Sequence, residues 1–483
     1  MKILCALLLC VSSAVFANQA ERPPNILLII GDDMGNETLS CYDWSENPAK
    51  TPTLDDLCNS GVRFNNFWSQ PSCSPTRATM LTGRYAFRTG VGRPTGDRDA
   101  MGYFPQLLPK PESAPAELNR AAGRRAEGRA LPRENAPADW GLPLTEFTLP
   151  MAFRVNKQLG YSTAAIGKWH LSDRRNGWED HPNLIGFDLF SGLIRGFPDS
   201  YFTWNKVVNG EWSGQTGYAP DDKTDDAINW IAAQGKQPWF LWMAYNLPHT
   251  PMHLPPENRR HNDYSHLDPQ ANPRDAGLEI ANAMLEALDI EIERMLASMP
   301  SDVRDNTYVI FMGDNGSGRN AVRPPVVADK AKGGLYQGGI NVPLFVVGPG
   351  VAQGVSDALV NSTDIFATVL ELAGIDQDET VPGQVTLDSV SFAPYLSNPS
   401  LQSLRSFAYS DVFPENFAGV HDADFAIRND QFKLIRRNGE FEFYDLQEDP
   451  FESNSLLNNE LSDEQQAQHD ALLAQVTSLR TGK

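Results

Sequence analysis

The sequence is poor in cysteine and in positive charge. Its 483 residues include 5 cysteines, and 40 Lys and Arg stand against 61 Asp and Glu, for a formal net charge of −21. So acidic a chain is not expected to bind nucleic acid, because such a partner requires a positively charged surface. An anionic ligand would instead need a local cluster of cations that acts against the overall field.

Long apolar runs are also scarce, apart from the first residues. Residues 1–17 combine Lys2, an apolar run from 3 to 9 and the small-residue cleavage site Val15-Phe16-Ala17, which is typical of a secretory signal peptide. The run is too short to span a bilayer, and no later stretch offers roughly 20 apolar residues. We therefore expect export to the periplasm or the extracellular space and no membrane partner. An N-terminal membrane anchor is the alternative.

The cysteines that would remain after cleavage are Cys41, Cys58 and Cys73. Their number is odd, so an exported protein is left with one cysteine outside any intramolecular disulfide. A Cys41–Cys58 disulfide would leave Cys73 free, although spacing alone does not establish that pairing. The chain is long enough, at 41% hydrophobic residues, for one large domain and a smaller one.

Cys73 directly precedes an expected helix. Pro75 suits a first helical turn, residues 78–81 can propagate the helix, and Gly83 can end it. Cys73 would then lie at the positive end of the helix, and Arg77 would add a fixed cation one turn along. This electropositive setting makes Cys73 a candidate nucleophile. The alternative is a buried structural cysteine.

Oxygen-bearing side chains follow two expected buried strands, at residues 25–30 and 307–313. These side chains are Asp32, Asp33, Asp314 and Asn315. Ligands of open α/β sheets gather at the carboxyl ends of strands, so the four side chains could converge on one metal ion. Oxygen ligands without histidine or thiolate favour Ca²⁺ or Mg²⁺ over zinc. A capped turn is the alternative for an Asp-Asp pair after a strand.

Basic side chains follow two further expected strands. Lys168 and His170 come after residues 161–166 and would share a face if the chain stays extended. His249 comes after residues 239–244, between prolines that rigidify the chain. Spacing alone favours a surface lysine at Lys168 and a histidine satisfied within the core at His170.

The segment Cys73-Ser74-Pro75-Thr76-Arg77 resembles the Cys-x-Pro-Ser/Thr-Arg signature of type I sulfatases. In that family a formylglycine-generating or maturation enzyme oxidises the cysteine to Cα-formylglycine, whose hydrated aldehyde is the nucleophile. Gly-Lys-Trp-His at 167–170, Pro-His-Thr-Pro at 248–251 and Lys332 before a Gly-Gly pair also resemble sulfatase motifs. Gln337 stands where the family usually has glutamate, which casts doubt on a local ion pair there.

The resemblance implies hydrolysis of sulfate esters through a formylglycine-diol nucleophile and a covalent sulfate intermediate. Export, the acidic composition and the basic segment at 93–142 favour a sulfated carbohydrate as substrate over a small aryl ester. It implies that His249, with Lys332 as a second candidate, protonates the leaving oxygen, and that His170 accepts the proton that releases sulfate. The implied catalytic residues are Cys73, Arg77, Lys168, His170, His249 and Lys332. The implied Ca²⁺ ligands are Asp32, Asp33, Asp314, Asn315 and the oxidised Cys73.

The implied fold is an alkaline-phosphatase-like α/β sandwich with a large mixed, mostly parallel sheet and a smaller C-terminal antiparallel sheet. We expect a signal peptide at 1–17, a catalytic domain at 18–385 and a C-terminal subdomain at 386–483. Residues 93–142 would form an insertion or long loop, whose arginines either attract a polyanionic substrate or lie on a solvated segment. These arginines are Arg120, Arg124, Arg125, Arg129 and Arg133.

Two other functions remain open at this point. One is a phosphodiester or phosphonate monoester hydrolase of the same fold, some of which share the formylglycine. The other is a non-catalytic protein that binds sulfated glycans and keeps Cys73 as a thiol. Comparing kcat/KM for matched sulfate and phosphate esters distinguishes a sulfatase from the first alternative. Mass spectrometry of the Cys73 peptide distinguishes it from the second, because only the sulfatase carries the aldehyde.

Overall fold

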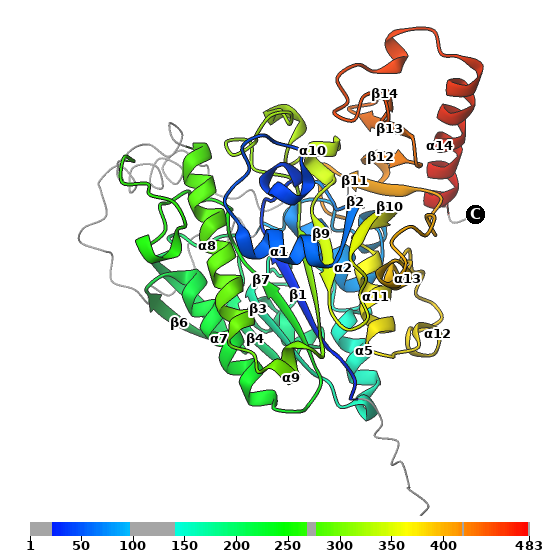
Figure 1. Ribbon diagram of the computed structural model, residues 1–483. Coiled ribbons are helices and arrows are strands. Elements are labelled where there is room, and N and C mark those ends of the chain that lie inside the picture. The colour runs from blue at the N-terminus through cyan, green and yellow to red at the C-terminus, as the bar shows by residue number, and fades with distance from the viewer. Residues whose placement is uncertain (1–21, 97–140, 268–276, 418–419, 482–483) are drawn as a thin grey trace, which may run out of the picture.

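The computed structural model describes residues 22–96, 141–267, 277–417 and 420–481. A ten-stranded sheet with helices on both faces forms the main body, and a second, four-stranded sheet forms a lobe beside it (Figure 1). The order of the large sheet is β10-β2-β9-β8-β1-β7-β3-β4-β5-β6. Its strands are β1 (Asn25–Gly31), β2 (Val62–Trp68), β3 (Ser162–Lys168), β4 (Leu189–Leu193), β5 (Thr203–Val208), β6 (Glu211–Thr216), β7 (Trp239–Ala244), β8 (Thr307–Gly313), β9 (Leu344–Val347) and β10 (Gly354–Asn361).

The centre of the sheet is parallel. Strand β1 pairs in parallel with β7 and β8, and β3 pairs in parallel with β7 and β4. All residues of β1 and β7 are buried, as expected for continuous apolar runs covered on both faces. The sheet is mixed because β9 runs antiparallel to β2 and β8. The predicted fold class is therefore confirmed.

Alternate side chains of β1 pack against different helices. Ile26, Leu28 and Ile30 belong to a core with α2 (Cys73–Thr82), α5 (Leu149–Val155) and α11 (Asp364–Leu372). Leu27 and Ile29 belong to a core with α1 (Pro52–Ser60), α7 (Ala219–Gln234) and α8 (Gly277–Ala297). Shorter helices are α3 (Ala86–Thr89), α6 (His181–Leu184), α9 (Ser301–Arg304), α10 (Gln337–Ile340), α12 (Gln377–Thr380) and α13 (Ala393–Ser397). Each layer thus buries one face of the sheet.

The four-stranded sheet is antiparallel throughout. Its order is β11 (Ala408–Val412), β12 (Asp424–Arg428), β13 (Phe432–Arg437) and β14 (Glu440–Asp445), and α14 (Asp463–Thr481) packs against it. Three of these strands match the sequence pattern, whereas β11 was not predicted. The lobe lies next to β2 and β10 (Figure 1), and the side-chain oxygen of Gln70 accepts hydrogen bonds from Ser410 and Asp411.

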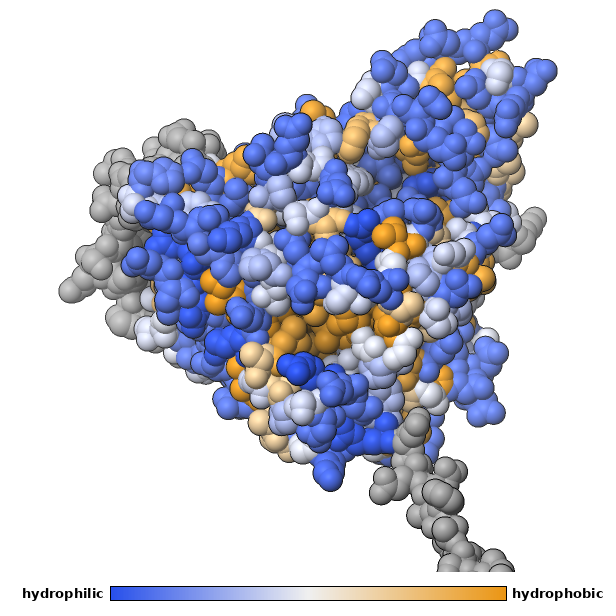
Figure 2. Space-filling view, in the orientation of Figure 1, coloured by the Kyte–Doolittle hydropathy of each residue, from blue (hydrophilic) through white to orange (hydrophobic). Residues whose placement is uncertain are grey.

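Several further expectations can be compared with the structure. Cys41 and Cys58 form a disulfide, with Cα atoms 6.4 Å apart, and Cys73 has no disulfide partner. Residues 1–17 and the arginines at 120, 124, 125, 129 and 133 lie outside the described residues. None of the described helices combines the length and apolarity that a membrane span requires. The face drawn in Figure 2 is mainly hydrophilic, in keeping with the acidic composition.

Candidate active site

The predicted site residues meet at one edge of the large sheet. Strands β8, β1, β7 and β3 are consecutive neighbours and run parallel, so their carboxyl ends lie together. Asp32 and Asp33 follow β1, Asp314 follows β8, Lys168 ends β3, and His249 follows β7. The N-terminus of α2 brings Cys73 to the same edge.

Cys73 is the first residue of α2, so the helix begins at the cysteine and not after it. The helix ends at Gly83 in the left-handed conformation, with a φ of 68°, as the sequence predicts. The Cys73 side chain is buried, and its Sγ lies 3.2 Å from Nδ1 of His170. The cysteine is therefore held against a histidine from the end of β3.

His170 is held as a neutral imidazole. Burial, with Lys168 and Arg77 nearby, lowers the pKa of His170 well below its usual value. Its Nε2 lies 2.8 Å from the carbonyl oxygen of Thr95, which requires Nε2 to carry the proton and to donate it. The lone pair of Nδ1 consequently faces residue 73 and can accept a proton there.

Three buried carboxylates are each paired with one cation. Nη2 of Arg77 lies 2.9 Å from Asp314, Nζ of Lys168 lies 2.6 Å from Asp32, and Lys332 bonds to Asp33. By formal charge these six groups sum to zero. The local repulsion of an anionic ligand is therefore much weaker than the net charge of the whole chain would suggest.

The residues present fit a hard cation. One ligand atom each from Asp32, Cys73 and Asp314 lie within 4.8 Å of one another. Oδ1 of Asp32 and Oδ1 of Asn315 are buried and accept no hydrogen bond from any described residue. Burial raises the pKa of Asp32 well above its usual value, and the nearby carboxylates of Asp314 and Asp33 add to the effect. A cation bound here would give both oxygens a partner and would lower the pKa of Asp32.

His249 is also neutral and faces Asp33. Its Nδ1 lies 2.8 Å from the carbonyl oxygen of Thr250 and donates to it, and its Nε2 lies 3.9 Å from Asp33. Burial and the positive charge of Lys332 lower the pKa of His249 to about 3, against the opposing effect of Asp33. Without substrate, its Nε2 is thus an acceptor and not a proton donor.

Lys332 remains the protonated group on this side of the site. Burial lowers its pKa, but Asp33 and the neighbouring acidic groups outweigh burial and hold the pKa of Lys332 above its usual value. Because its partner is Asp33, no glutamate at position 337 is needed to pair it. Gln337 instead accepts a hydrogen bond from Nε1 of Trp68 at 3.0 Å, and its backbone N–H donates to Glu452 at 2.6 Å.

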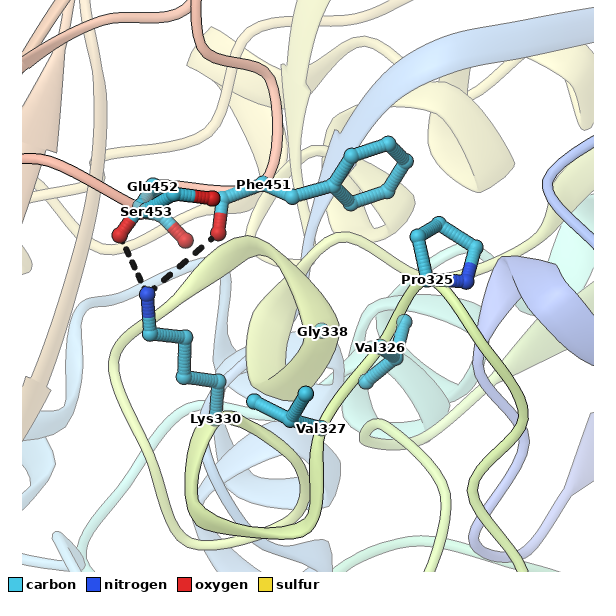
Figure 3. Close-up of a pocket in the computed structure, with 8 residues that line it drawn as sticks. All are labelled: Pro325, Val326, Val327, Lys330, Gly338, Phe451, Glu452 and Ser453. Atoms are coloured by element: carbon cyan, nitrogen blue, oxygen red, sulfur yellow. Dashed lines mark hydrogen bonds between the residues drawn. The ribbon is translucent and has the colours of Figure 1, made fainter.

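The segment that carries Lys332 also borders a pocket of about 260 Å³, shown in Figure 3. Its lining comes from residues 325–330, Gly338 and residues 451–453, and it contains none of the predicted site residues. Lys330 crosses it to donate to the carbonyl oxygens of Phe451 and Glu452. The C-terminal part of the chain therefore anchors the segment on which Lys332 lies.

Sequence reasoning missed three contributors to the site. The Thr95 carbonyl sets the proton position on His170, and a backbone atom leaves no signal in the sequence. Ser74 donates to the His170 carbonyl at 2.8 Å, and Gly196 packs directly on the His170 ring. His253 belongs to no motif that the sequence shows, and its ring stacks on Tyr201, with ring centroids 4.1 Å apart. Sequence reasoning assigned no role to Gly196.

Comparison with known families agrees with this geometry. The Sulfatase family model matches residues 24–375, and a model described as N-sulphoglucosamine sulphohydrolase, C-terminal, matches residues 330–480. The chain is 28% identical over 425 residues to the uncharacterized sulfatase YdeN of Escherichia coli, which covers 78% of this chain and 66% of that protein. The chain thus spans about two thirds of that relative's length.

Two further relatives have more specific names. Human N-acetylgalactosamine-6-sulfatase is 27% identical over 453 residues, covering 88% of this chain and 76% of that protein. An ulvan-active sulfatase of Formosa agariphila is 27% identical over 475 residues, covering 93% and 81%. The crystal structure of Ps i-CgsB matches with a TM-score of 0.72 at 23% identity, covering 95% of this chain and 92% of that chain, which supports the fold.

Proposed function

Because the chain belongs to the sulfatase family, whose members are sulfuric ester hydrolases, we propose that it removes sulfate from a carbohydrate. The observation that supports the chemistry best is the contact between residue 73 and His170. A neutral imidazole presents its free Nδ1 3.2 Å from Sγ of Cys73, among buried side chains that include the cations Arg77 and Lys168. That arrangement suits proton transfer at residue 73.

The nucleophile in this proposal is a modified residue 73, and the Sγ in the structure stands in for its hydroxyl oxygens. Converted by a maturation enzyme to Cα-formylglycine, residue 73 would supply one hydroxyl that attacks sulfur and a second whose deprotonation releases sulfate. His170 accepts that proton at Nδ1, since Thr95 keeps the proton of the ring on Nε2. Ser74 holds the backbone of His170 in place.

Lys168 and Lys332 bind and orient the sulfate in this proposal, whereas Arg77, fully buried against Asp314, polarises the diol of residue 73. The charges of these three cations are balanced by three carboxylates, so a divalent cation would bring the formal charge of the group to +2 and match an anionic ester. The oxygens of Asp32, Asp33, Asp314, Asn315 and residue 73 would hold that cation, which we propose to be Ca²⁺. Such preorganised charge is usually the largest contribution to lowering the barrier.

The alcohol that leaves must receive a proton from a group other than His170. Lys332 is protonated in the substrate-free site, whereas His249 has to take up a proton first, together with the anionic substrate. We therefore assign the proton donation to His249 and Lys332 together. Both groups lie next to Asp33, so they are close to each other.

A carbohydrate substrate is supported by the names of two relatives, which refer to an amino sugar and to ulvan. Export to the periplasm or beyond, inferred from residues 1–17, agrees with a polymer that cannot enter the cell. We also propose that residues 18–385 form the catalytic domain and residues 386–483 a C-terminal subdomain.

The test measures sulfate release from defined ulvan, carrageenan, fucan and glycosaminoglycan oligosaccharides, with matched phosphate esters as controls. We expect kcat/KM to be higher for a sulfate ester than for its phosphate counterpart. Mass spectrometry of the Cys73 peptide should detect an aldehyde that reacts with hydrazides. A preference for the phosphate ester, or an unmodified and still active Cys73, would contradict the proposal.

A further inference from the structure

The segment that follows β4 runs between the two site histidines. His170 N–H donates to the carbonyl oxygen of Ile194 at 3.0 Å, and Nδ2 of Asn246 donates to the carbonyl oxygen of Gly196 at 3.3 Å. A Cβ placed on Gly196 would lie 2.5 Å from Cε1 of His170, closer than any real contact allows. The backbone at 194–196 is therefore fixed against the His170 ring and tied to the segment that leads to His249.

The next residue, Phe197, covers the other histidine. Its ring is stacked on the His249 imidazole, with centroids 5.6 Å apart and planes inclined by 17°. This is the offset arrangement that aromatic pairs prefer. The backbone contacts of Gly196 thus hold the segment from which the Phe197 side chain reaches His249.

Phe197 differs from the other residues of the site in its exposure. Cys73, Lys168 and His249 are buried, whereas Phe197 keeps 39% of its surface accessible. This large apolar side chain therefore lies at the surface directly beside the buried His249, with the Arg195 guanidinium 6.0 Å from the centroid of its ring. It is not required for burial of the core, because it belongs to none of the core clusters formed by the described residues.

The position of Phe197 defines what it can contact. In the proposed reaction the ester oxygen that leaves with the alcohol lies at His249 and Lys332, so the group attached to that oxygen lies next to the Phe197 ring. A pyranose ring presents a face of C–H groups that packs on an aromatic face, while its hydroxyls remain in water. An inorganic sulfate ion has no such group and would not reach Phe197.

We propose that Phe197 is a specificity-determining residue that supports the sugar ring of the leaving group. This inference rests on the proposed function and adds to it: the substrate presents a pyranose with one apolar face next to the sulfated position. The residue then contributes to substrate binding and not to charge stabilisation at sulfur.

The test uses the oligosaccharide of the panel above that the wild-type enzyme desulfates fastest. Phe197→Ala and Phe197→Leu should each lower kcat/KM for it about tenfold through a higher KM, whereas Phe197→Trp should retain it. Inhibition by inorganic sulfate should be unchanged, because that ion fills only the sulfate pocket. Phe202→Ala is the matched control, since Phe202 is 41% exposed in the same segment but packs edge-on against His253.

Each other outcome has a distinct meaning. A loss confined to kcat, or an equal loss of sulfate inhibition, would show that Phe197 only positions His249 and would overturn the inference. Equal effects of Phe197→Ala and Phe202→Ala, or no effect of any Phe197 variant, would overturn it as well. If the wild-type enzyme desulfates no carbohydrate of the panel, the proposed function fails first and is recognised by that result alone.

Discussion

Single atoms set the chemistry of His170. The carbonyl oxygen of Thr95 accepts the Nε2 proton, and burial beside Lys168 and Arg77 keeps the ring neutral. The free Nδ1 is therefore already directed at residue 73 before any substrate binds. In the proposed reaction His170 is a general base positioned in advance, and such a base contributes roughly 10²- to 10⁴-fold to a rate.

His170→Ala should accordingly lower kcat for sulfate release by about 10²- to 10⁴-fold with a smaller change in KM. His253→Ala is the control, because His253 bonds to Tyr218 at 3.1 Å and lies outside the proposed catalytic set. Mass spectrometry of the Cys73 peptide in each variant shows whether modification has occurred. Equal losses in the two fully modified variants would refute a specific role for His170.

Another histidine, His181, matters for stability and not for catalysis. Its Nδ1 accepts a hydrogen bond from Nε1 of Trp169 at 3.0 Å, and its Nε2 donates to the carbonyl oxygen of Leu142 at 2.8 Å. Both nitrogens are satisfied only in the neutral ring. Burial lowers the pKa of His181 to about 4. Protonation would break the bond to Trp169, the residue between Lys168 and His170.

The sign of the resulting pH dependence follows from this lowered pKa. Below pH ~6.5 the unfolded chain binds a proton at His181, whereas the folded chain binds it only below about pH 4. The free energy of unfolding should therefore fall as pH drops from ~6.5 to ~4, by about 3 kcal/mol from this residue. Denaturant unfolding at several pH values, compared with His181→Gln, measures the difference. Identical pH slopes in the two proteins would contradict it.

At the scale of elements, the two sheets are joined through the segment that carries Lys332. Glu452 follows the last strand of the small sheet and accepts the backbone N–H of Gln337 in α10. Its other partner is Lys433 of β13, which is fully buried and lies over the Trp68 ring, 4.8 Å from the centroid. This buried pair connects the small sheet to β2 and to the 325–338 segment.

Glu452→Ala should destabilise the protein by about 3–5 kcal/mol, because it leaves Lys433 buried without a counter-charge. It should also raise KM, since the segment that carries Lys332 loses an anchor. The double variant Lys433→Met with Glu452→Gln removes the unpaired charge and keeps an acceptor for Gln337, so it should be more stable than Glu452→Ala. Thermal and denaturant unfolding of the two variants test this, and equal stability would contradict it.

Some elements could be predicted from the sequence and others could not. Strands β1, β7 and β8 were predicted closely because strands buried on both faces are continuous apolar runs. The apolar spacing of residues 144–160 predicts an amphipathic helix over that whole range, and this prediction is wrong in extent, since α5 spans only Leu149–Val155. Pro150 lies in its first turn, and a proline inside a longer helix would have removed a backbone hydrogen bond. Pro150 therefore indicates that the helix begins near residue 149, whereas the apolar pattern alone extends it to residue 144.

The proposed metal site depends on the whole molecule, because the oxygens that would hold the cation come from residues far apart in the chain. Asp32 and Asp33 follow β1, and Asp314 and Asn315 follow β8, almost 300 positions later. Folding brings Oδ1 of Asp314 to 3.2 Å from the backbone nitrogen of Asp33, and Nδ2 of Asn315 to 2.8 Å from its carboxylate. A cation bound here would bind the folded chain and not the unfolded one.

Adding Ca²⁺ to chelator-treated protein should therefore raise the free energy of unfolding by about 2.7 kcal/mol at a concentration 100 times Kd. Thermal unfolding and calorimetric titration measure this without any assay of activity. Asp32→Asn should abolish most of the effect, whereas Asp329→Asn, at a carboxylate 94% exposed, should leave it intact. A Ca²⁺ response that persists in Asp32→Asn would refute the assigned site.

The sequence by itself determined which residue types are available and which strands are buried. Local apolar runs and the proline and glycine at the ends of α2 were enough to predict the central strands and this helix. The fold class and the set of candidate residues came from the resemblance of several short motifs to one family. These features are local, so they can be recognised without knowledge of contacts between distant segments.

Only the tertiary structure decided how those residues act on one another. The proton position on His170 depends on the backbone carbonyl of Thr95, and the ion pair of Lys332 depends on Asp33. The aromatic ring beside His249 comes from Phe197. Each of these contacts joins segments whose separation in the chain bears no relation to their distance in space. Their energies therefore exist only once the strands have assembled and excluded water from the site.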